Sequence, residues 1–129
     1  MNQSLRILYS SFLGICAGFL GGLLGISGTI IMLPLLTMFS IFSNYQVAIG
    51  TVLFSFEPFG SIFALIQYAK EKKIDYLIGI IIVFSYMLGS YIGAKYHTNF
   101  NEKSIKYMTA IILSILSIYM FYNAYNVNL

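Results

Sequence analysis

The first half of this chain has almost no charge. No acidic, basic or histidine side chain occurs in residues 7–56, and charged residues make up only 9% of the 129 positions. Average globular chains carry about 25% charged residues, so an uncharged stretch of this length excludes the core of a small water-soluble domain. It can hold two or more membrane crossings, because each crossing needs about 20 apolar residues. The sequence predicts an integral protein of the cell membrane, plasma or inner.

Other absences exclude several function classes. The chain has no tryptophan and a single cysteine, Cys16, which cannot form an intrachain disulfide or complete a metal-ligand set. The net charge of +3 is small and lies in the loops, which gives no support for nucleic-acid binding. No nucleophile–base set, phosphate-binding loop or nucleotide fingerprint occurs. The sequence therefore predicts neither an enzyme nor a cofactor or metal site.

Five apolar segments are separated by polar clusters, and we expect one all-α transmembrane bundle with about four spans, residues 1–129 forming a single domain. The segments cover residues 7–26, 30–42, 47–69, 76–94 and 107–122. The second would be about 20 Å long as a helix, which is short of the hydrocarbon thickness of about 30 Å. It is expected to be a half-helix, a re-entrant element or a tilted short span.

The positions of the basic residues do not orient the chain. If residues 30–42 cross the membrane, Arg6 lies on the side of Lys95, Lys103 and Lys106. If they re-enter, Arg6 lies with the three lysines of residues 70–73. Four basic residues oppose three in both cases, so the positive-inside rule selects neither orientation.

Glycines recur at helical spacing in two segments. Gly14, Gly18 and Gly22 lie four residues apart, and Gly89 and Gly93 repeat the spacing. Stripes of small residues let helices approach closely in lipid, where packing drives association. We interpret both stripes as helix-packing surfaces.

The run Gly25, Ser27, Gly28 and Thr29, with Pro34 downstream, differs from these stripes because it favours an interruption of the helix. A new helix beginning near Thr29 would direct free backbone N–H groups and a positive dipole end into the protein. Such a helix start binds anions without a lysine or arginine, and broken helices hold substrates in several transporter folds. These five residues are candidate substrate-binding residues, with a plain kink as the alternative.

Three polar residues farther along complete the candidate set. Glu57 lies inside the third apolar segment, where a charge is costly and marks a functional site. It is a candidate proton-coupling residue, and the alternative is a hydrogen bond to a neighbouring helix. Thr51 could line the pathway or bond back to a helix carbonyl. Asn44 is a further candidate for substrate binding.

In order, the chain has GFLGGLLGISGTIIMLPLL (18–36), AIGTVLF (48–54), Pro58 with Gly60, a basic loop that ends at Asp75, and LGSYIGAKY (88–96). This order resembles the sulfite exporter TauE/SafE family over roughly residues 14–122. The resemblance implies a permease for sulfite, sulfonates or related anions. Family members usually contain two similar halves, and this chain looks like one. It departs from the family at residues 27–29, and at Glu57, where the family usually has an apolar residue.

Three functions are therefore open. The first is a secondary permease for small sulfur anions, a homodimer or paired with a second half-permease, because sites in repeat-built transporters lie between repeats. The second is an exporter of cations similar to the small multidrug-resistance proteins, which are also short and dimeric with an intramembrane glutamate. The third is a non-transporting membrane interaction protein that packs through its glycine stripes.

Overall fold

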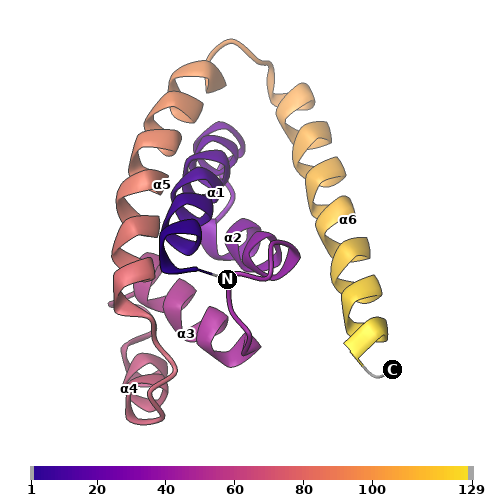
Figure 1. Cartoon of the computed structure of the whole chain (residues 1–129). Helices are drawn as coiled ribbons and strands as arrows, with labels where there is room; N and C mark the ends of the chain where they lie inside the picture. The colour runs from indigo at the N-terminus through magenta and orange to yellow at the C-terminus, as the bar shows by residue number, and fades with distance from the viewer. Residues whose placement is uncertain (1, 128–129) are drawn as a thin grey trace.

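The computed structural model describes residues 2–127, and this part of the chain is helical without strands (Figure 1). The six helices are α1 (Gln3–Leu24), α2 (Gly28–Met38), α3 (Tyr45–Phe56), α4 (Ile62–Lys70), α5 (Tyr76–His97) and α6 (Glu102–Val127). The predicted all-α class is confirmed. By length and composition, α1, α5 and α6 can cross a membrane, while α2 and α3 are shorter apolar helices.

The central pair of the fold consists of α1 and α5, which lie side by side (Figure 1). Near the start of α1, Arg6 donates a hydrogen bond of 2.7 Å to Asp75, the residue before α5. At the other end, His97 Nδ1 lies 2.6 Å from the carbonyl oxygen of Leu23. The starts of the two helices are therefore adjacent, as are their ends, and the helices run parallel.

Glycines bring the backbones of this pair into contact. A Cβ atom placed on Gly18 would lie 2.2 Å from the carbonyl oxygen of Tyr86. One placed on Gly89 would lie 2.0 Å from the carbonyl oxygen of Ile15. Real Cβ atoms do not approach oxygen so closely, so only glycine permits this spacing. The predicted packing role of both glycine stripes is confirmed.

The third apolar segment, residues 47–69, is not one span. It divides into α3 and α4 of 12 and nine residues, about 18 and 14 Å long. The break follows from Pro58, which lacks the N–H that would continue α3 and disfavours helical backbone at the preceding residue. Glu57 accordingly has φ −130° and ψ 46°. Three of the described helices have spanning length and two more are shorter apolar helices, so the expected number of about four spans stays a prediction.

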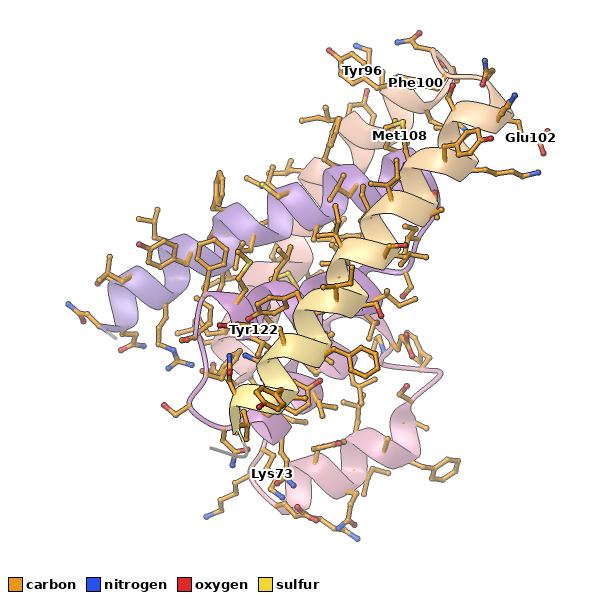
Figure 2. The ribbon with its side chains drawn as sticks, turned by 90° about the vertical axis from the view of Figure 1, so that its right-hand side faces the viewer. Lys73, Tyr96, Phe100, Glu102, Met108 and Tyr122 are labelled. Atoms are coloured by element: carbon orange, nitrogen blue, oxygen red, sulfur yellow. The ribbon has the colours of Figure 1, made fainter. Side chains whose placement is uncertain are left out.

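The short helices bring the chain back to the end of the bundle where α1 begins. The loop after α2 is at this end, because Arg6 Nε donates to the carbonyl oxygen of Ile41 at 3.2 Å. From there α3 leads away, and α4 returns to Lys73, which lies at the opposite end of the molecule from Tyr96 and Glu102 (Figure 2). Arg6 thus lies with the lysines of residues 70–73. Residues 30–42 and α4 both end near Arg6, and whether residues 30–42 cross the membrane or re-enter it stays a prediction.

The charged loop after α4 is held by its own side chains. The Lys73 ammonium and the Gln67 amide both donate to the carboxylate of Glu71. The hydrogen bond from Lys73, followed by that from Gln67, lowers the pKa of Glu71. Glu71 therefore stays ionised at neutral pH, as expected for a segment at the membrane surface.

The buried core lies where α1, α2 and α5 meet. Its residues include Leu13 and Ala17 of α1, Ile31, Met32 and Leu36 of α2, and Ile78 and Ile82 of α5. In contrast, none of the residues of α4 or α6, all of which are described, is buried. Figure 1 shows α6 standing apart from α5 on the far side of α2. These two helices present apolar side chains that the chain itself does not cover.

Candidate functional site

The helix break that follows α1 leads into the bundle at the buried Gly28. The chain turns at residues 25–27, and α2 begins at Gly28, one residue before the predicted start near Thr29. A Cβ on Gly28 would lie 2.6 Å from the ring of Phe56 and 2.8 Å from the ring of Tyr86. Because Tyr86 lies halfway along α5, the start of α2 is near the middle of the central pair rather than at its end.

The turn itself depends on Gly25. This residue caps α1 with φ +70°, and its N–H donates to the carbonyl oxygen of Gly21 at 2.9 Å. Side-chain-bearing residues avoid this left-handed backbone, whereas glycine adopts it freely. Gly25 therefore allows the chain to reverse directly at the end of α1 and to start α2 within the protein.

Glu57 connects two helix starts through its carboxylate. The Thr29 hydroxyl, in the first turn of α2, donates to Oε1 at 3.0 Å. The Ser61 hydroxyl, immediately before α4, donates to Oε2 at 3.1 Å. Within residues 2–127, no basic side chain lies at ion-pair distance from Glu57. The carboxylate is thus held by hydroxyl groups alone, in a half-buried position.

Backbone donors add to this environment. Helix starts carry unpaired N–H groups and a partial positive charge. Ser27 and Ser61, which precede α2 and α4, make no capping hydrogen bond with their side chains. The serine side chains therefore leave the first backbone donors of both helices uncapped, near the Glu57 carboxylate that Thr29 and Ser61 bond through their hydroxyls.

The remaining candidate residues near the break do not contact Glu57 through recorded hydrogen bonds. Gly25 and Ser27 are exposed and Gly28 is buried, all within the turn that leads to Thr29. Pro34 is buried farther along α2. It leaves the helix intact but removes one backbone N–H from it. Of the residues at the break, Thr29 alone is bonded to Glu57.

Thr51 and Asn44 have other partners. The buried Thr51 hydroxyl accepts a hydrogen bond of 2.9 Å from the N–H of Asp75, which ties α3 to the start of α5. Asn44 caps the start of α3, where its side chain accepts from the N–H of Gln46 at 2.9 Å. The length of α3, about 18 Å, separates Asn44 from Glu57. One small ion cannot contact both residues at once.

Sequence analysis did not identify Ser61. Its signal was nevertheless present: a hydroxyl residue four positions after Glu57 and directly before an apolar helix, which is a position where serine is favoured. The hydrogen bond between Thr29 and Glu57 had no local signal, because it joins residues 28 positions apart.

Short helices that start or end inside the protein, beside a parallel pair of spanning length, define a class of polytopic membrane proteins with interrupted helices. Irregular backbone at membrane depth is tolerated only where protein or a watery cavity surrounds it. Comparison with known proteins identifies the class further. The profile of the sulfite exporter TauE/SafE family matches residues 10–128. The chain therefore belongs to this family and is an integral protein of the cell membrane.

Two curated relatives give the same result. The chain is 34% identical over 112 residues to a protein of Bacillus subtilis (strain 168) named "Probable membrane transporter protein YunE", covering 82% of this chain and 41% of the relative. It is 28% identical over 118 residues to a protein of Methanocaldococcus jannaschii named "Probable membrane transporter protein MJ0441", covering 83% of this chain and 42% of the relative. The chain thus spans about two fifths of the length of these relatives. No solved structure matches it.

Proposed function

We propose that this protein is the subunit of a secondary permease that moves small sulfur-containing anions, such as sulfite and sulfonates, across the cell membrane. The observation that carries the proposal is the position of Glu57, whose carboxylate is bonded by Thr29 and Ser61 at two helix starts. Helix starts of this kind bind anions, and membership of the TauE/SafE family supports a sulfur oxyanion as the substrate.

The proposed mechanism follows from competition between two anions. The Glu57 carboxylate takes the two hydroxyl donors, Thr29 and Ser61, that a substrate anion would use. Two negative charges a few Å apart repel each other strongly away from water, so an entering anion favours protonation of Glu57. The neutral side chain then releases Thr29 to the substrate. One proton would accompany each anion, and Glu57 would couple the two movements.

Uptake into proteoliposomes tests this function. We expect the purified protein to take up radiolabelled sulfite saturably and above protein-free vesicles, with faster uptake when the sulfite side is acidic. The cation-exporter reading rests on the same Glu57, since an intramembrane carboxylate also suits cations. Uptake of tetraphenylphosphonium in place of sulfite would favour that reading. If the folded protein moves neither ion, transport by this chain alone is wrong and a non-transporting interaction protein becomes the better reading.

We further propose that two copies of this chain assemble. The chain has about two fifths of the length of its relatives, and sites in repeat-built transporters lie between two repeats. The α3–α4 turn beside Glu57 leads into the most exposed aromatic residues, with Phe59 89% and Phe63 86% exposed. A second copy that covers α4 and α6 would enclose the site at Glu57.

Cysteine cross-linking in native membranes tests the homodimer. In a Cys16→Ser background, which has no other cysteine, Phe63→Cys is expected to give a disulfide-linked dimer on mild oxidation. Phe84→Cys is the matched control, because this aromatic residue is 64% exposed on α5 and would face lipid. Monomers from both variants, together with a monomeric mass in mild detergent, would contradict the homodimer and point to a separate second half-permease.

A further inference from the structure

A polar cavity lies at the other end of α3 from Glu57. It has a volume of about 300 Å³ and is lined by Arg6, Val47 and the loop residues 40–44. This loop joins α2 to α3 at the end of the bundle where α1 begins. A cavity of this size is large enough for a small oxyanion and several waters, since one water occupies about 30 Å³.

Arg6 is held at the wall of this cavity and keeps N–H donors that are not used by the protein. Its Nε atom donates to the Ile41 carbonyl oxygen at 3.2 Å, and one terminal nitrogen donates to Asp75 at 2.7 Å. The guanidinium also lies over the ring of Phe42, with Cζ 5.1 Å from the ring centroid. A guanidinium has five N–H donors, so these two bonds leave others for a ligand. The ion pair and the ring hold the group in one orientation.

The other polar residues of the cavity are also donors. The Asn44 side-chain oxygen Oδ1 accepts from the N–H of Gln46, which leaves the side-chain N–H₂ of Asn44 for a ligand. Ser40 and Ser43 contribute hydroxyl groups. Among the described lining residues none is acidic. The donor set therefore matches a small anion, with the charge of Arg6 shared between the cavity and Asp75.

The loop is held in an uncommon conformation at this cavity. Ser40 has φ +50°, a left-handed backbone that few residues other than glycine adopt. Such conformations carry a cost and cluster at functional sites. The next residue, Ile41, is buried and accepts the bond from Arg6. The strained backbone thus fixes the loop against the guanidinium.

We propose that this cavity is an entry site, at the membrane surface, where a small oxyanion binds to Arg6, Asn44 and the loop hydroxyls before it passes along α3 to Glu57. The identity of the anion rests on the proposed function, whereas the charge of the site rests on its donors. This site gives Asn44, which is remote from the helix break, a direct role in substrate binding.

A tryptophan reporter tests the site without transport. The chain has no tryptophan, so Phe42→Trp introduces a single fluorophore beside Arg6. Sulfite is expected to change its emission saturably, and chloride at equal ionic strength is expected to have little effect. Phe100→Trp serves as a matched reporter at the opposite end of the molecule (Figure 2) and should not respond. A response that is absent, or identical with chloride, would overturn the proposal.

A variant that adds a negative charge to the cavity provides a second test. Asn44→Asp keeps the cap of α3, since aspartate caps as well as asparagine, but replaces a donor with a negative charge. In the Phe42→Trp protein we expect it to raise the Kd for sulfite about tenfold. Asn101→Asp makes the same change at the residue before α6, where the side chain accepts a hydrogen bond of 2.8 Å from the N–H of Ser104. This variant should leave the Kd for sulfite unchanged. Equal effects of the two variants would also overturn the entry site.

The two readouts separate the entry site from the transport function. Binding that follows this pattern without any sulfite uptake would retain the anion cavity and reject the permease. Saturable uptake without a reporter response would retain the permease and reject the cavity. Because binding is measured on the purified chain, neither result depends on the other.

Discussion

Replacement of Glu57 by glutamine is expected to abolish the acceleration of sulfite uptake by a pH gradient. Glutamine has nearly the same shape and can still accept a hydrogen bond from Thr29 or Ser61, which bond the carboxylate at 3.0 and 3.1 Å. It cannot gain or lose a proton, so the gradient has no group through which to act. The gradient-driven rate should fall at least about tenfold, corresponding to about 1.4 kcal/mol, while uptake without a gradient persists. Initial rates at several external pH values measure this effect.

The control for this experiment is Glu102→Gln. Glu102 is an exposed residue that pairs with Lys106 on the same helix, outside the apolar segments. The Glu102→Gln variant should keep the full acceleration of sulfite uptake by the pH gradient. Thr29→Ser retains a hydroxyl for Glu57 and should respond as well, whereas Thr29→Val removes the donor and should weaken sulfite binding. A normal gradient response in Glu57→Gln would show that the carboxylate only bonds two helices together.

The elements of this site differ in how well the sequence predicts them. The break at residues 25–27 was predicted, because glycine, serine and threonine at adjacent positions interrupt a helix by local chemistry alone. Glu57 was singled out by its cost in an apolar segment. The hydrogen bond between Glu57 and Thr29 could not be predicted from the sequence, because it depends on how α2 and α3 pack. No periodicity within either helix contains that information.

Prediction of the topology from the sequence is limited in the same way, because it also depends on contacts between distant residues. The division of residues 47–69 into α3 and α4 had a signal in Pro58, but the segment's apolar composition favoured one span. Asn44 was grouped with the helix break, and its position in the chain could not show that the length of α3 separates the two. The pair of Arg6 and Asp75, which fixes the parallel arrangement of α1 and α5, joins residues 69 positions apart. Such contacts depend on the packing of whole helices, which the glycine stripes allow to approach closely.

The close approach of α1 and α5 leads to the second large effect, because Gly89→Ala is expected to destabilise the folded protein strongly. The added methyl group would lie 2.0 Å from the carbonyl oxygen of Ile15, a backbone atom that cannot rotate away. Alanine gains up to about 1 kcal/mol in helix propensity over glycine, but overpacking costs about 1–3 kcal/mol and occasionally more. The cost of the clash is expected to exceed the gain in helix propensity, so thermal unfolding in mild detergent should show a lower Tm.

The matched control is Gly60→Ala, because a methyl group at Gly60 would meet no atom within 4 Å and its backbone is not left-handed. This variant should unfold near the wild-type temperature. The effect of Gly89→Ala should also reach the site, since movement of α5 displaces the Tyr86 ring, which packs edge-on against Phe56 with centroids 4.7 Å apart. Phe56 directly precedes Glu57, so sulfite uptake should fall even at temperatures where the variant remains folded. Equal Tm values for the two variants would mean that α1 and α5 are less tightly packed than their glycine contacts require.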